Sequence, residues 1–187
     1  MALEYNIPTY LTLLRIALIP LLAIVFYLPW SHANVACTAI FLIAGFTDWL
    51  DGYLARKMGL ETSFGAFLDP VADKLMVAIV LVLIVGHEAT PYIAVPSAII
   101  IGREITIASL REWMAEIGQR AKVKVSSIGK WKTSAQMLAI GFLLYGEDLA
   151  GMPTKTIGYW LLYIAAALTL WSMLNYLSAA MRTLTKE

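Results

Sequence analysis

Charge, cysteine and histidine are all scarce in this chain of 187 residues. Charged side chains make up 14% of it, the formal net charge is only +1, and there are one cysteine and two histidines. A single thiol, Cys37, has no partner for a disulfide within the chain and forms no zinc-binding pattern. The nearly neutral charge balance gives no basis for nucleic-acid binding. These shortages argue against a disulfide-rich domain, a zinc protein and a nucleic-acid-binding protein.

What the chain has in abundance is apolar sequence. Hydrophobic residues make up 60% of it, and the mean hydropathy of +0.73 is too high for an ordinary soluble domain. Polar or Pro/Gly-rich interruptions separate six apolar segments, at residues 8–28, 33–56, 65–86, 92–113, 128–145 and 156–181. Each is near the ~20 residues that a helix needs to cross a bilayer, and helices satisfy their own backbone polar groups in lipid. We therefore expect an all-α integral membrane protein with six transmembrane helices, and residues 1–187 as a single membrane-embedded domain.

The basic residues predict the orientation. The loops after the first, third and fifth segments contain Lys155 as their only lysine or arginine. The other side of the predicted bundle collects most of the remainder: Arg56, Lys57, Arg111, Arg120, Lys122, Lys124, Lys130, Lys132, Arg182 and Lys186. Cytoplasmic loops carry the excess of Lys and Arg. This side, with both termini, is therefore expected in the cytoplasm.

Four aspartates lie between residues 48 and 73, at the predicted cytoplasmic ends of the second and third segments. Asp48 and Asp51 are three residues apart and Asp69 and Asp73 are four apart, so each pair shares one face of a helix. Carboxylates crowded at a membrane would be largely protonated unless cations lay between them. With oxygen donors and little cysteine or histidine, the expected ions are Mg²⁺ or Mn²⁺. A polar helix end in the headgroup region would explain one pair, but explains two pairs on the same side poorly.

The same stretch carries a spaced motif that resembles the signature of the CDP-alcohol phosphotransferase family. It consists of Asp48, Asp51, Gly52, Ala55, Arg56, Gly65, Asp69 and Asp73. Within that family, residues 6–15, 103–115 and 129–136 resemble most the bacterial phosphatidylglycerophosphate synthases. The resemblance implies the CDP-alcohol phosphotransferase fold, one catalytic domain and a homodimer in the bacterial inner membrane.

The resemblance also implies an activity and residue roles. The phosphatidyl group of CDP-diacylglycerol would be transferred to sn-glycerol 3-phosphate, giving phosphatidylglycerophosphate and CMP in phospholipid biosynthesis. Two divalent cations would be held by the four aspartates, and Asp73 would also be the general base. The nucleotide of CDP-diacylglycerol would be contacted by Gly52, Ala55, Arg56 and Gly65.

Basic residues near the cytoplasmic ends of the fourth and fifth segments are candidates for the acceptor site. Arg111, Lys130 and Lys132 suit an acceptor that carries its own phosphate. Lys130 and Lys132 are two residues apart and so lie on different helical faces, which favours contact by only one of them. The alternative is the positive-inside signal together with attraction to anionic lipid, which accounts for Arg120, Lys122 and Lys124.

Other polar residues leave two interpretations open. Arg103 lies at membrane depth, where it either serves the site or pairs with a carboxylate such as Glu104 or Asp73; Lys74 is equally open. In segment 6–15, Asn6, Thr9, Thr12 and Arg15 either contact substrate or cap and anchor the first helix.

Three other functions compete with the predicted one. A family member with a different acceptor, such as serine, inositol phosphate or phosphatidylglycerol, would share the same motif. A cation channel or transporter would also place carboxylates in the membrane, but its path needs polar residues across the full thickness. Here the acidic residues crowd at one side. A structural membrane protein would tolerate Asp→Asn changes at all four positions.

Overall fold

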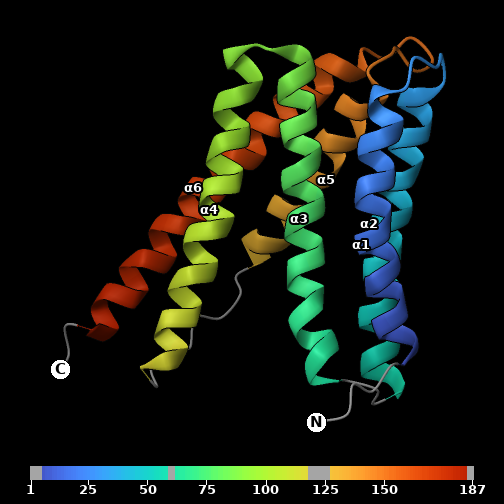
Figure 1. Ribbon diagram of the computed structural model, residues 1–187. Helices are drawn as coiled ribbons and strands as arrows, with labels where there is room; N and C mark the ends of the chain where they lie inside the picture. The colour runs from blue at the N-terminus through green and yellow to red at the C-terminus, as the bar shows by residue number, and fades with distance from the viewer. Residues whose placement is uncertain (1–5, 59–61, 118–126, 185–187) are drawn as a thin grey trace. The chain divides into compact units, whose positions relative to one another are not determined.

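The computed structural model describes residues 6–58, 62–117 and 127–184, and these fold almost entirely into helices (Figure 1). Six α-helices lie within them: α1 (Ile7–Tyr27), α2 (Ala33–Met58), α3 (Ser63–Glu88), α4 (Pro91–Glu116), α5 (Ser127–Tyr145) and α6 (Thr154–Leu184). Each helix matches one apolar segment, with ends that differ by no more than three residues. The predicted all-α architecture is confirmed.

Four of these helices are long and apolar enough to cross a bilayer. The qualifying stretches are Thr9–Tyr27, Ala33–Leu54, Pro91–Glu116 and Thr154–Ser178. Within the described residues, α3 and α5 do not qualify. In α3 the uninterrupted apolar run is residues 75–86, which spans about 18 Å at 1.5 Å per residue. That is shorter than the ~30 Å of a bilayer core, because the first part of α3 carries Asp69, Asp73 and Lys74. The chain is thus a membrane protein, and crossing by all six helices stays a prediction.

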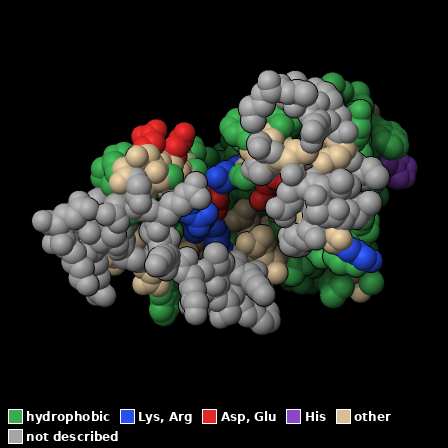
Figure 2. Space-filling model, turned by 90° about the horizontal axis from the view of Figure 1, so that it is seen from below, with side chains coloured by type: hydrophobic (Ala, Val, Ile, Leu, Met, Phe, Trp, Pro, Cys, Tyr) green, Lys and Arg blue, Asp and Glu red, His purple; other side chains and the backbone are tan. Residues whose placement is uncertain are grey.

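Large apolar side chains point away from the helix contacts. Ile24, Leu42 and Trp171 are each about three-fifths exposed. In water such faces would be a liability, whereas lipid is the solvent that suits them. The face seen in Figure 2 carries both green hydrophobic side chains and red and blue charged side chains.

The first of two compact units comprises Met1–Gly86 with Leu144–Glu147. In it α1 packs along α2, and the side chains of Leu22 and Phe41 are fully buried. The beginning of α1, the end of α2 and the beginning of α3 all lie at one end of this unit (Figure 1). This arrangement brings the polar N-terminal turns of α1 to the same level as the aspartates.

The second unit comprises His87–Leu143 with Asp148–Glu187. Here α4 packs against α6, around buried apolar side chains that include Ile100, Ile140 and Leu162. Gly158 lets α6 come close to α5, because a Cβ atom at that position would lie 2.8 Å from Cγ of Leu143. Small residues at such contacts are typical of helices packed within a membrane.

Candidate active site

Two aspartates of the motif lie near the end of α2. The side chain of Asp51 is 2% exposed and that of Asp48 is 45% exposed. Their spacing of three residues on a helix directs both to the same side, as predicted from the sequence. An ionised carboxylate buried as deeply as Asp51 is costly unless a cation pairs with it.

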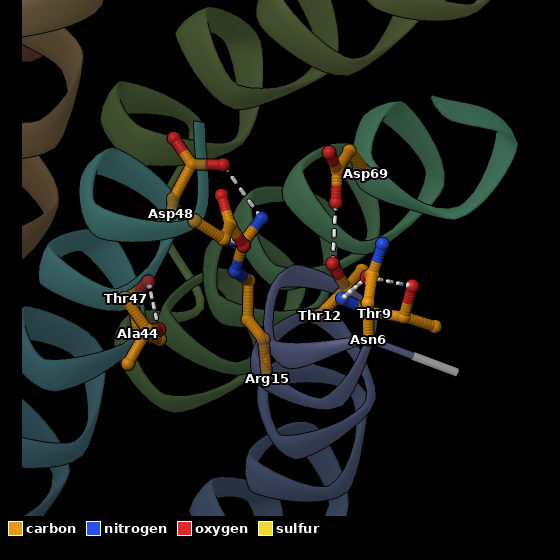
Figure 3. Close-up of polar contacts among 9 residues, drawn as sticks. Asn6, Thr9, Thr12, Arg15, Ala44, Thr47, Asp48 and Asp69 are labelled. Carbon is orange, nitrogen blue, oxygen red and sulfur yellow. Dashed lines mark hydrogen bonds and ion pairs between the residues drawn. The ribbon is translucent and has the colours of Figure 1, made fainter. Parts of the chain in front are cut away.

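Within the described residues that cation is Arg15, on α1. Its Nη1 donates to Oδ1 of Asp48 at 2.6 Å, and its Nη2 donates to Oδ2 of Asp51 at 2.5 Å (Figure 3). The Arg15 side chain is 1% exposed, and its planar fork suits two acceptors at once. From the sequence the role of Arg15 stayed open. The signal that could have identified this contact is a charged residue inside an apolar helix, which needs a partner of opposite charge.

Asp69 on α3 is contacted by the same face of α1. The hydroxyl of Thr12 donates to Oδ1 of Asp69 (Figure 3), and Thr12 is 1% exposed. Thr12 and Arg15 are three residues apart, so one face of α1 reaches both α2 and α3. Asp73 follows Asp69 by one turn and is exposed. The first helix therefore contacts both halves of the motif, which its sequence alone did not reveal.

The N-terminal ends of α1 and α3 are capped by side chains. Oδ1 of Asn6 accepts from the backbone N–H of Thr9 at 3.1 Å and from its hydroxyl at 2.8 Å (Figure 3). The capping interpretation of Asn6 is thus confirmed. Oγ1 of Thr62 accepts from the backbone N–H of Gly65 at 3.0 Å, and a Cβ at Gly65 would lie 3.1 Å from that oxygen. Gly65 therefore has a structural reason to be glycine, beside its expected nucleotide role.

The other expected nucleotide contacts follow Asp51 along α2. Gly52 is half-buried directly after Asp51. Ala55 and Arg56 belong to α2, but their side chains lie outside the described part of the structure. Their predicted contacts with the nucleotide therefore stay predictions.

In the second unit, three charged side chains and a serine form a network across three helices. Oε1 of Glu104 on α4 accepts from Nη1 of Arg103 at 2.7 Å and from Nζ of Lys132 on α5 at 2.6 Å. Nη2 of Arg103 also donates to Oγ of Ser172 on α6 at 3.2 Å. Glu104, one of the two carboxylates considered as partners for Arg103, is in contact with it. Lys132 is 5% exposed. This predicted phosphate ligand is therefore buried, and its ammonium group pairs with Glu104.

Of the other basic candidates in this unit, the structure describes the side chain of Arg111 but not that of Lys130. Arg111 is exposed on α4, and its guanidinium carbon lies 5.3 Å from the ring centroid of Tyr176 on α6, within the range of a cation–π contact. Lys130 belongs to α5, but its side chain is outside the described part, as are all of Arg120, Lys122, Lys124 and Lys186 and the side chain of Arg182.

Comparison with known proteins adds the family. The family model for CDP-alcohol phosphatidyltransferase matches residues 5–171 of this chain. The chain belongs to this family. The match includes the whole motif from Asp48 to Asp73 and reaches into α6, so the resemblance predicted from the motif is confirmed.

Curated relatives match this chain over 95% of its length. A Haemophilus influenzae protein is 56% identical over 178 residues, covering 95% of each chain. A Salmonella choleraesuis protein is 53% identical and a Shigella flexneri protein 52% identical, each over 95% of this chain and 96% of the relative. All three are named CDP-diacylglycerol–glycerol-3-phosphate 3-phosphatidyltransferase.

CDP-alcohol phosphatidyltransferases generally use divalent cations, and the donor set here fits such ions. The carboxylate oxygens of Asp48, Asp51 and Asp69 are the hard ligands that Mg²⁺ and Mn²⁺ prefer. The ion pairs with Arg15 take one oxygen from Asp48 and one from Asp51, which leaves a second oxygen on each. Across the described ranges, no three Asp, Glu, His or Cys side chains already stand close enough to hold an ion together. The donors therefore fit such ions by their chemistry.

Proposed function

We propose that this chain transfers the phosphatidyl group of CDP-diacylglycerol to sn-glycerol 3-phosphate, giving phosphatidylglycerophosphate and CMP. The observation that carries this function is identity above 50% with relatives named for that reaction, over 95% of the chain. The motif from Asp48 to Asp73 supplies the matching chemistry. The enzyme would serve phospholipid biosynthesis.

The aspartates would organise the reacting groups. Asp48, Asp51, Asp69 and Asp73 would hold two divalent cations, Mg²⁺ or Mn²⁺, which supply charge neutralisation at the diphosphate and its leaving oxygen. Asp73 would take the proton from the terminal hydroxyl of the acceptor as that oxygen attacks the phosphorus on the lipid side. The bond from this phosphorus to CMP breaks, and CMP leaves. The exposure of Asp73 supports this role, since a general base must be reachable by the acceptor.

The nucleotide end of the donor would lie along α2 and the beginning of α3. Gly52 and Ala55 would leave room for the cytidine, and Arg56 would bind phosphate oxygens through its fork. Gly65, at the beginning of α3, would leave room for the nucleotide on the side of the site that faces Gly52 and Ala55. The half-buried position of Gly52 next to Asp51 supports this placement.

The phosphate of the acceptor would be bound by Arg111, Lys130 and Lys132. Arg111 is exposed and available to a soluble anion. Lys132 is paired with Glu104 at 2.6 Å, so to bind phosphate it would have to share that carboxylate or leave it. The excess of two cations over one anion in the network of Arg103, Glu104 and Lys132 supports an anion site in this unit.

We infer that the whole chain forms one catalytic domain in the bacterial inner membrane. All six helices would cross it, with the aspartates facing the cytoplasm and both termini on that side. The distribution of basic residues supports this orientation. The acyl chains of the donor would stay in lipid against the exposed apolar faces. A homodimer is the assembly that the family resemblance implies.

The experiment that tests the function measures CMP release by the purified full-length protein in mixed micelles containing CDP-diacylglycerol. Glycerol 3-phosphate, serine, inositol phosphate and phosphatidylglycerol are offered in turn as acceptors. We expect turnover with glycerol 3-phosphate, loss of it on exhaustive chelation, and its return on adding Mg²⁺ or Mn²⁺. Turnover with serine instead would refute the acceptor, and turnover that survives chelation would refute the metal assignment.

A further inference from the structure

Arg15 is a fully buried cation on a helix that contributes no residue to the motif. Within the described residues, both of its hydrogen bonds go to motif carboxylates, at 2.6 Å to Asp48 and 2.5 Å to Asp51. Its Nε is also buried and has no hydrogen-bond partner among the described residues. Among the described residues, the guanidinium is therefore held through its two ends by the two aspartates.

The ion pair is closed on one side and open on the other. Asp51 is 2% exposed, whereas Asp48 is 45% exposed. An ion pair that only stabilises the fold needs no such opening, but a pair that shares its carboxylates with an incoming ligand does. The ligand class that two ionised carboxylates attract most strongly is a cation.

We propose that Arg15 is a positioning residue that acts as the internal counter-ion of the metal-binding aspartates and competes with a divalent cation for them. The inference rests on the proposed role of Asp48 and Asp51 as metal ligands. Arg15 offsets one of the two negative charges and fixes the spacing of the carboxylates when no cation is bound. When a cation binds, the negative charge is shared between it and the guanidinium.

The sign of one measured change separates this role from a purely orienting one. Side chains that only orient metal ligands strengthen metal binding, and their loss weakens affinity by about 10–100-fold. A positive charge in contact with two ligands has the opposite effect, because it repels the incoming cation through an interior of low dielectric. Removal of Arg15 should therefore tighten metal binding if it competes, and weaken it if it only orients.

The test uses the full-length protein in detergent, without lipid substrate, and follows free Mn²⁺ by electron paramagnetic resonance during a titration. We expect Arg15→Gln to bind Mn²⁺ about tenfold more tightly than wild type, since the competing charge is gone. Lys155→Gln removes a positive charge that pairs with Glu88 at 2.7 Å, at the end of α3 opposite to Asp69, and should leave the Mn²⁺ affinity unchanged. Weaker or unchanged binding by Arg15→Gln would overturn the proposal.

Thermal unfolding gives a second measurement on the same samples. Without added metal, Arg15→Gln should melt below wild type, because Asp51 is left buried without a cation. Added Mn²⁺ should then raise its melting temperature by more than it raises that of wild type. Equal rises in the two proteins would count against competition.

A conservative variant covers the case in which Arg15→Gln does not fold. Arg15→Lys keeps the charge and loses the fork, so its Mn²⁺ affinity should stay within about threefold of wild type. A loss of tenfold or more in Arg15→Lys would show that the fork orients the ligands, and would overturn the proposal. If wild type turns over glycerol 3-phosphate while these affinities fail to change as expected, only this inference fails and the proposed function stands. A wild-type protein that binds no Mn²⁺ would refute the metal assignment beneath both.

Discussion

Thr12 and Arg15 stand three residues apart on α1, and together they contact three of the four motif aspartates. Both side chains are 1% exposed, so neither is itself in contact with water. A buried carboxylate gains its orientation from such partners, and that orientation decides how well it can hold another ligand. Single side chains outside the motif therefore set the geometry of the motif.

We predict that Thr12→Val lowers kcat for phosphatidyl transfer by about tenfold, because Asp69 loses the hydroxyl that orients it. Valine keeps the shape of threonine, so the melting temperature should change little. The matched control is Thr47→Val on α2, next to Asp48 in the chain, whose buried hydroxyl donates only to the Ala44 carbonyl of its own helix, at 2.8 Å (Figure 3). Steady-state kinetics on both variants checks this, and equal losses would contradict it.

At the other end of α3, Glu88 shows how partners shift a single group. Burial raises the pKa of Glu88, but hydrogen bonds from Lys155 and Tyr159 outweigh it, so the pKa lies below the ordinary value. The two contacts measure 2.7 Å to Lys155 and 3.1 Å to Tyr159. A carboxylate with a lowered pKa adds stability above its ordinary pKa, and loses it as the pH falls through the lowered value.

We predict that the melting temperature of wild type falls more steeply than that of Glu88→Gln between about pH 5 and pH 3. The amide does not titrate, so its variant lacks this contribution at every pH. Tyr159→Phe removes one of the two bonds and should give an intermediate slope. Scanning calorimetry across this range measures the slopes, and parallel curves for wild type and Glu88→Gln would reject the assignment.

At the scale of helices, the close contact between α5 and α6 depends on Gly158. Gly158 lies on α6 where a Cβ would come 2.8 Å from Cγ and 3.1 Å from Cδ2 of Leu143 on α5. Overpacking a tight contact costs about 1–3 kcal/mol. An alanine in a helix returns up to about 1 kcal/mol relative to glycine, so the steric cost should win.

We predict that Gly158→Ala destabilises the protein by about 1 kcal/mol. Gly141→Ala on α5 is the matched control, because nothing lies within 4 Å of a Cβ at that position. It should be neutral or slightly stabilising, through helix propensity alone. Thermal unfolding of the two variants in the same detergent measures the difference, and equal stability would show that Leu143 simply moves aside.

At the scale of the whole molecule, the chain is polarised along its helices. Basic residues other than Lys155 avoid the loops after the first, third and fifth apolar segments. Apolar side chains face outward along the helices. This distribution predicts one orientation in a membrane, with the basic side inside the cell.

The single cysteine makes this orientation testable. Starting from Cys37→Ala, new cysteines are introduced one at a time at the exposed positions Ser31 and Lys57. We predict that a membrane-impermeant maleimide labels Ser31→Cys in intact spheroplasts and labels Lys57→Cys only after the membrane is opened. The reverse pattern would mean that the aspartates face the outside of the cell.

The helices and the family could be predicted from the sequence, whereas the contacts of single site residues could not. Apolar runs ended by polar residues gave all six helices to within three residues at each end, because lipid leaves the backbone no other partner. The motif spacing and the resemblance predicted the family, which is confirmed, and the reaction, for which a relative 56% identical to this chain is named. The roles of single site residues and the crossing by α3 and α5 remain predictions.

The sequence by itself determined which residues are helical, which face of each helix carries its carboxylates, and which family the chain belongs to. Periodicity is a local property, and a spaced motif lies within neighbouring stretches of chain. Only the tertiary structure decided that Arg15 pairs with aspartates 33 and 36 residues away. It also decided that Thr12 donates a hydrogen bond to Asp69 and that the buried Lys132 pairs with Glu104. The physical reason is that a buried charge requires a partner, while helix packing alone selects which one is within reach.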